Sequence, residues 1–342
     1  GAIGAALITK ERFEQNHPAK TFIGIDGVAD FSYTQEANAP CPFCANHCKR
    51  TIVRFSNGNS WVTNNRCERG EILGDPKDAS VRQQLEDARK SREQTPNLFK
   101  LRQELLFKDY PCPKAAKERD ITIGLPRVLS YWETMPFWTT FWRTLGFELQ
   151  LSDLSTRKIY EDGLSAVTSD TVCFPAKLVH GHLRNLAKKG VDRIFMPSIT
   201  TVTSENTEST SESMCAIVKG YPIVIRNSDN PEKRWHIPFD TPLFHWYRNE
   251  DRNRQLTGYM EKTFGISPAE TRQAINVADA AEKQFHDEMH RAGKAVLDEV
   301  TANGSYAVVL ASRPYQNDAL VNHDLPEMFT SLGIPVLTAD SL

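Results

Sequence analysis

The chain has 342 residues, with 41 Lys and Arg against 43 Asp and Glu, nine His and seven Cys. A net charge of −2 gives no bulk attraction to nucleic acid or anionic lipid, and no apolar run approaches the roughly eighteen residues of a membrane-spanning helix. Seven cysteines are too dilute here for a disulfide-stapled secreted scaffold. We therefore expect a soluble, cytoplasmic protein of more than one domain that binds neither nucleic acid nor membrane.

Residues 1–40 predict a helix end, a short strand at FIGIDG and then a polar loop. The apolar start is short and no basic residue precedes it, so it is not a signal peptide. The segment GAIGAALI is typical of the last turns of a packed helix, and IPVL near the other end is typical of a buried strand. We expect the sequence to be a piece of a longer chain.

Residues 41–70 form a compact unit that holds four cysteines. Cys41, Cys44 and Cys48 are followed, after eighteen residues, by Cys67. The segments TIVRF and SWVTN flank an Asn-Gly turn, which predicts a β-hairpin that returns Cys67 to the other three thiols. Four sulfur ligands fit either a structural zinc or a cubane iron–sulfur cluster, and His47 could replace one thiol. The sequence therefore predicts a metal-binding knuckle with the metal left open.

Residues 71–116 predict a helical linker. The stretch Ser80–Asp109 is charge-rich and helical in period, with an interruption at Pro96. A stripe of four leucines marks its second half: Leu98, Leu101, Leu105 and Leu106. We interpret this stretch as a surface or linker helix.

Residues 117–230 alternate between strand and helix. The strands ITIGL and FELQLS flank a helix that Gly146 ends, and its aromatic stripe is expected in the core. A second helix, from about Ala176 to Lys189 with Gly190 after it, precedes the strand VDRIFMP. This order predicts an α/β fold with a parallel, helix-covered, doubly wound sheet.

Three further segments complete the chain. Residues 198–213 are almost wholly polar and predict a mobile loop or lid. Residues 231–300 predict a helical region, and residues 301–342 the start of a second α/β unit.

Two more cysteines stand where a loop leads into a helix. Cys173 precedes Phe174 and Pro175, and Cys215 follows the polar segment. Helix N-termini favour thiolates, and such junctions gather at one edge of a doubly wound sheet, so both thiols are candidate ligands or nucleophiles. A buried structural role is the alternative for Cys173, and Cys112, between two prolines, is expected to be inert.

Other polar residues have weaker signals. His180 and His182 are expected as polar residues on a helix face, with metal ligation or a thiol-enzyme role beside Cys173 as alternatives. Arg313 and His323 follow a strand end and could meet an anionic or thioester ligand. No Walker loop, dinucleotide fingerprint or G-x-S-x-G elbow is present, so nucleotide binding and serine hydrolysis have no support.

Long strings from about residue 40 onward resemble one known family. They include SDTVCFPAKLVHGHLRNLAKKGVDRIFMP, CAIVKGYPIVI and SRPYQNDALVNHDLPEMFTSLGIPVLTADS. The sequence resembles the acyl-CoA dehydratase activase-related proteins, large anaerobe proteins also called CoA-substrate-specific enzyme activases. GAIGAALI is similar to the end of their ATP-binding activase domain.

The resemblance implies a system related to 2-hydroxyacyl-CoA dehydratases and double-cubane cluster proteins, in which an activase uses ATP to drive low-potential electrons into iron–sulfur clusters. It implies a dehydratase-like fold with Cys173 and Cys215 as cluster ligands, the four-cysteine knuckle as a second metal or cluster site, and a further cluster ligand from elsewhere. The expected function is an iron–sulfur electron-transfer module, not an ATPase by itself. Its expected partners are the activase domain of the parent chain and a dehydratase-like protein or acyl-CoA. The alternative is a zinc-stabilised, non-redox module that binds a partner or an acyl-CoA.

Overall fold

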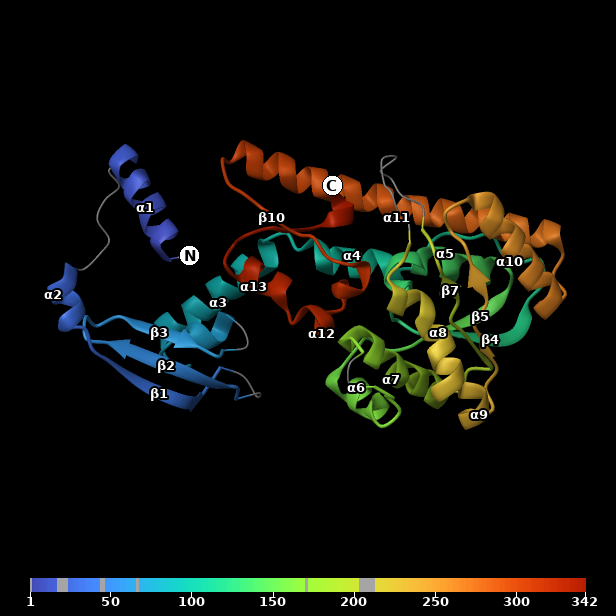
Figure 1. The fold of residues 1–342 in the computed structure, drawn as a ribbon, viewed down its shortest axis with the longest axis horizontal. Helices are drawn as coiled ribbons and strands as arrows, with labels where there is room; N and C mark the ends of the chain where they lie inside the picture. The colour runs from blue at the N-terminus through green and yellow to red at the C-terminus, as the bar shows by residue number, and fades with distance from the viewer. Residues whose placement is uncertain (1, 17–23, 44–46, 66–67, 170–171, 203–212) are drawn as a thin grey trace. The chain divides into compact units, whose positions relative to one another are not determined.

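The computed structural model describes residues 2–16, 24–43, 47–65, 68–169, 172–202 and 213–342. The chain divides into two compact units, Gly1–Arg89 and Lys90–Leu342, and each has its own hydrophobic core. Figure 1 shows the elements of both units, coloured from blue at the N-terminus to red at the C-terminus.

The first unit is built on a three-stranded antiparallel sheet in the order β1-β2-β3. Its strands are β1 Tyr33–Pro40, β2 Lys49–Phe55 and β3 Ser60–Thr63. Its helices are α1 Ala2–Asn16, α2 Gly24–Ala29, η1 Glu68–Glu71 and most of α3 Ala79–Gln94. The predicted hairpin is confirmed, because β2 pairs with β3 across a turn in which Gly58 takes a φ of 86°.

Two predictions for the first forty residues are wrong. The last four residues of the expected strand FIGIDG, Gly24–Gly27, belong to the helix α2, and β1 lies in the expected polar loop. Nearly every side chain of β1 is exposed, so the strand has no alternation of apolar and polar residues to reveal it. Its place comes from backbone pairing with β2, whose Ile52 and Val53 are buried.

The second unit contains a four-stranded sheet in the order β5-β4-β6-β8, and every neighbouring pair is parallel. Its strands are β4 Arg119–Leu125, β5 Phe147–Leu151, β6 Arg193–Phe195 and β8 Phe239–Asp240. Two smaller parallel pairs are β7 Ser198–Ile199 with β9 Leu243–Phe244, and β10 Val308–Leu310 with β11 Val336–Thr338. The α/β class is thus confirmed, while the specific dehydratase-like winding stays a prediction.

Helices flank these sheets (Figure 1). The longer ones are α4 Leu98–Phe107, α5 Tyr131–Thr144, α6 Arg157–Leu164, α7 Phe174–Lys189, α8 Ala216–Ser228, α10 Asn249–Phe264 and α11 Pro268–Ala302. The short ones are α9 Pro231–Trp235, η2 Pro314–Asn317, α12 Ala319–Asn322, α13 Leu325–Ser331 and η3 Ala339–Ser341. The longest, α11, packs along α4, α5 and α10, which ties the C-terminal pair of strands to the rest of this unit.

The aromatic stripe of α5 is the centre of the core, as predicted. Trp138 and Trp142 are fully buried and contact Phe195 of β6 edge-on at centroid distances of 4.7 and 5.1 Å. The helix ends at Gly146, whose φ of 82° and contact with the Lys117 carbonyl leave no room for a side chain.

The leucine stripe of α4 corrects our interpretation of that segment. Leu98, Leu105 and Leu106 are buried in the core of the second unit, so α4 is not a surface or linker helix. The break between the units falls earlier, after Arg89. In the predicted lid, Ser198–Ile199 form β7 and Thr201 bridges to Ser213, while residues 203–212 lie outside the described part of the chain.

Candidate functional site

Cys173 and Cys215 each occupy the N-cap of a helix. Cys173 caps α7, with Pro175 in the first turn, and its carbonyl accepts hydrogen bonds from two amides of that turn. Cys215 caps α8. The Cys173 side chain is exposed and that of Cys215 is half-buried. Each thiol therefore lies at the positive end of a helix dipole, which stabilises a thiolate.

Both thiols lie within electrostatic range of Tyr315 of η2. Burial raises the pKa of Tyr315, and negative charge at Cys215 and at Cys173 raises it further, whereas Arg313 opposes the rise. A cavity of about 290 Å³ lies here, lined by Cys173, Tyr315 and His323 among others. Cys173 and Tyr315, which are far apart in the sequence, thus line the same cavity.

Behind Cys173 lies a buried chain of hydrogen bonds. Asp229 accepts from Nδ1 of His180 at 2.6 Å, and it also pairs with Arg234. The proton on Nδ1 makes Nε2 an acceptor, so the Tyr221 hydroxyl donates to it at 3.1 Å. Burial raises the pKa of Tyr221 to about 12, with negative charge at Cys173 and Asp229 adding to it. Tyr221 is thus a neutral phenol near the Cys173 thiol.

A second buried chain joins the first sheet of this unit to its C-terminal part. Ser152 Oγ lies 2.7 Å from Nδ1 of His182, and Ser155 Oγ lies 2.9 Å from Nε2. Ser155 in turn donates to the carboxylate of Asp318, just before α12. Burial, together with the charge of Arg127, lowers the pKa of His182 to about 3, so the ring is neutral. This chain braces the segment that carries Tyr315.

These networks correct the prediction for the two histidines. His180 and His182 are fully buried instead of forming a polar helix face. All four ring nitrogens have protein partners, which leaves none for a metal or for a direct bond to Cys173. The sequence carries no local signal for Tyr221, Asp229 or Tyr315, because their partners are distant along the chain.

The four-cysteine segment is described only in part. Cys41 is buried, Cys48 is half-buried, and the Cys41 amide donates to the Cys48 carbonyl at 2.9 Å. Nδ1 of His47 lies 3.3 Å from the Cys41 carbonyl. Cys44 and Cys67 lie outside the described residues, so the convergence of four thiols stays a prediction.

The remaining candidates are placed as follows. Cys112 is half-buried and lies apart from the Tyr315 cavity, and Arg313 is exposed and lines a second, larger cavity. Within the described ranges, no three side chains of His, Cys, Asp or Glu are arranged to hold a metal ion. None of the helices in the described part of the chain combines the length and the apolar character that a bilayer crossing requires.

Comparison with known proteins assigns most of the second unit to a family. A model of the family described as CoA enzyme activase uncharacterised domain (DUF2229) matches residues 122–342, which include both capping thiols and Tyr315. No curated protein and no solved structure matches the chain. Because the matched segment is well over half of the 342 residues, the chain belongs to this family of CoA enzyme activase domains.

Proposed function

We propose that this chain is an iron–sulfur-binding electron-transfer module of an ATP-dependent activase system related to 2-hydroxyacyl-CoA dehydratases. The observation that carries the proposal is that two helix-capping thiols, Cys173 and Cys215, both lie within electrostatic range of Tyr315. Membership of the CoA enzyme activase family supports the setting. The proposed partners are the ATP-hydrolysing activase domain of the same parent chain and a dehydratase-like protein or acyl-CoA.

The two capping thiols fit part of the ligand set of a cluster. Cys173 and Cys215 provide two thiolates at helix N-termini, where amide groups stabilise negative charge. Within the described residues, no group of three His, Cys, Asp or Glu side chains is arranged to hold a metal ion, so a cluster would need further ligands from outside them. A bound cluster would supply one-electron transfer at low potential.

Two tyrosines shape the surroundings of the thiols. Tyr315 and Tyr221 both have raised pKa values, so both hydroxyls keep their protons at neutral pH. They add no negative charge beside the thiolates. The His180–Asp229 pair holds the hydroxyl of Tyr221 in a fixed position, which gives one side of the Cys173 thiolate a defined polarity.

Anaerobic reconstitution with iron and sulfide tests the proposal. We expect the protein to bind iron and sulfide, to show a broad sulfur-to-iron charge-transfer absorption, and to give an electron paramagnetic resonance signal on reduction. Cys173→Ala and Cys215→Ala should each remove that signal. Cys112→Ala is the matched control, since it removes a half-buried free thiol away from the cavity. Unchanged iron content and spectrum in both Cys173→Ala and Cys215→Ala would reject the proposal.

The knuckle supports a second candidate, a zinc-stabilised module without redox chemistry. The buried Cys41 and the backbone pairing of Cys41 with Cys48 set two thiols at the open end of the β2–β3 hairpin. Elemental analysis of protein purified in air separates the two candidates at this site. One zinc and no iron, lost in Cys41→Ser but kept in Cys173→Ala, favours zinc in the knuckle.

A further inference from the structure

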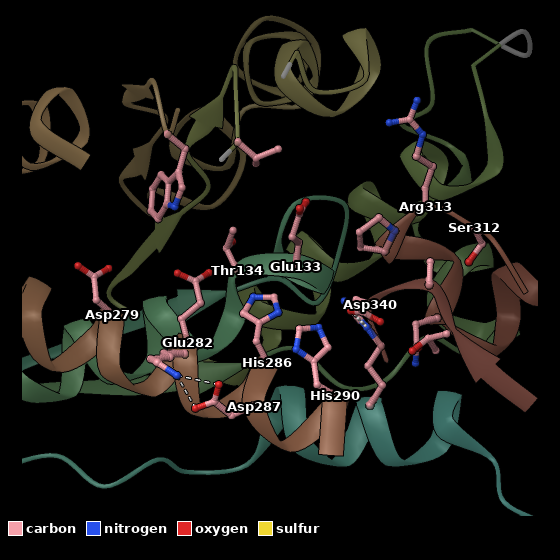
Figure 2. Close-up of a pocket in the computed structure, with 18 of the residues that line it drawn as sticks. Glu133, Thr134, Asp279, Glu282, His286, Asp287, His290, Ser312, Arg313 and Asp340 are labelled. Carbon is pink, nitrogen blue, oxygen red and sulfur yellow. Dashed lines mark hydrogen bonds and ion pairs between the residues drawn. The ribbon is translucent and has the colours of Figure 1, made fainter. Parts of the chain in front are cut away.

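A cavity of about 670 Å³ lies elsewhere in the second unit (Figure 2). One wall is a polar stripe of α11, and Glu133 and Thr134 from the first turn of α5 also line it. Another side is closed by Ser312–Pro314 and Asn317, which follow β10, and by Thr338–Asp340 at the end of β11. Ligands of parallel sheets bind at the carboxyl ends of strands, and a volume of this order suits a small organic molecule.

Most charges in the cavity wall are already neutralised. Three ion pairs account for six side chains: Arg102 with Asp340 at 2.7 Å, Arg252 with Asp279 at 2.8 Å, and Lys283 with Asp287 at 2.6 Å. Within the described residues, the carboxylates of Glu133 and Glu282 make no hydrogen bond or ion pair. Figure 2 shows Glu282 on the α11 stripe with His286 and His290, and Glu133 on α5. Outside the three ion pairs, the cavity wall therefore holds two acidic side chains and, besides the two histidines, one basic side chain, the exposed Arg313.

The protonation of these two groups follows from their surroundings. Burial raises the pKa of Glu282 to about 8; Arg252 opposes the rise, and Asp279 and Glu133 add to it. Burial also raises the pKa of Glu133, while Arg102 and the exposed Arg313 act against it. At neutral pH, Glu282 thus keeps a proton, because burial outweighs the charge of Arg252.

An independent observation points to a missing donor. Asn317 is only 5% exposed and lines the same cavity. Its amide nitrogen donates to the Phe99 carbonyl at 2.8 Å, which fixes the orientation of the group, and its Oδ1 has no hydrogen-bond partner. A buried acceptor without a donor costs free energy, and a ligand N–H group that reaches this oxygen after a small side-chain shift would satisfy it.

We propose that this cavity binds an organic cation, an amine or guanidine, with Glu133 and Glu282 as its counter-charges and the Asn317 Oδ1 as a further acceptor. The aromatic side chains of Phe99 and Trp246 provide apolar wall for its carbon chain. A bare metal ion fits less well, because the described residues include no group of three metal-binding side chains. The proposal uses neither Cys173 nor Cys215 and stands apart from the iron–sulfur proposal.

Isothermal titration of the full chain with putrescine, spermidine and agmatine tests the inference. We expect at least one of them to bind, and 1,4-butanediol, the neutral counterpart of putrescine, not to bind. A cation between the two carboxylates should expel the proton of Glu282. The binding enthalpy at neutral pH should therefore depend on the buffer in the direction of proton release, by most of one proton per ligand.

Two variants and a matched control sharpen the test. Glu282→Gln, which copies the shape of the protonated acid, should fold normally, weaken binding about tenfold or more and abolish the proton release. Glu133→Gln should weaken binding similarly. Asp298→Asn, which removes an exposed carboxylate from α11 outside the cavity, should leave binding unchanged.

Four results would overturn the inference. They are the absence of binding by all three amines, equal binding of 1,4-butanediol, proton uptake on binding, and binding of Mg²⁺ alone that Glu282→Gln abolishes while no amine binds. Each outcome is independent of iron content, so it cannot be confused with a failure of the iron–sulfur proposal.

Discussion

Two histidines on α7, two positions apart, have the same burial and different environments. His180 donates to a carboxylate and accepts from a phenol, whereas His182 lies between two serine hydroxyls with no acid in direct contact. A buried ring without a charged partner resists protonation. Beside the Cys173 thiol, the phenol of Tyr221 is thus neutral, whereas the Asp229 carboxylate farther along the same chain of hydrogen bonds pairs with Arg234.

The neutrality of His182 makes stability depend on pH. Its pKa is about 3 in the fold against 6.5 when exposed, so the unfolded state binds more protons between those values and the unfolding free energy falls as pH falls below about 6.5. When the pH is lowered from about 7.5 to 5, the unfolding free energy of the native chain should fall by about 2 kcal/mol more than that of His182→Gln. Urea denaturation at both pH values measures this, and equal losses would contradict the assignment.

The hydroxyl of Tyr221 has a purely local test. Tyr221→Phe leaves Nε2 of His180 without a donor in a buried place and should lower the unfolding free energy by about 1–3 kcal/mol. Tyr306→Phe is the control, because Tyr306 is exposed. Loss of its hydroxyl should change the unfolding free energy by less than about 0.5 kcal/mol. Chemical denaturation compares them, and similar values for both would show that the phenol does not serve the histidine.

At the scale of elements, α6 and α7 pack with backbone against backbone. A methyl group on Gly181 would lie 1.9 Å from the Ile159 carbonyl oxygen, and one on Gly163 would meet the Gly181 amide at 2.3 Å. This close approach fixes α7, and with it the Cys173 N-cap, against its neighbour. Two glycines on facing helices thus position the thiol from a distance.

A pair of glycine variants tests that packing. Gly181→Ala should destabilise the fold by about 3 kcal/mol or more, because the helices must move apart. Gly220→Ala in α8 meets nothing within 4 Å and should stabilise it by about 0.5–1 kcal/mol through helix propensity. Thermal unfolding measures the stability of both variants. A Gly181→Ala variant as stable as the native chain would contradict the close packing.

Elements with one-sided periodicity were predictable from the sequence. The aromatic stripe of α5, the glycine that ends it and the parallel strands around it follow from local pattern, and the structure confirms them. The leucines of α4 also predicted a helix, but periodicity does not tell which surface a helix covers. Strand β1 was missed because an exposed strand depends on pairing alone.

The candidate site was predictable only at positions where a local sequence pattern marks the start of a helix. The N-cap positions of Cys173 and Cys215 follow from the local pattern. Tyr315, Asp229 and the Glu133–Glu282 cavity depend on contacts between elements far apart in the chain, and no local spacing records them.

For the whole molecule, the two units have separate cores. The apolar cluster of the second unit draws only on residues from Leu98 onward, and both thiols and both cavities belong to that unit. We expect a fragment Lys90–Leu342 to unfold cooperatively, with a midpoint within about 3 °C of the main transition of the full chain. Calorimetry of both measures this. A fragment that fails to fold would show that the first unit is needed for its stability.

The central claim is that Cys173 and Cys215 bind one iron–sulfur cluster. Anomalous scattering at the iron absorption edge, from crystals of anaerobically prepared protein, locates iron directly. A cluster bound by both cysteines should give one compact group of iron peaks within bonding distance of both Sγ atoms and beside Tyr315. Iron found only at the four-cysteine segment, or nowhere in a well-ordered map, would contradict it.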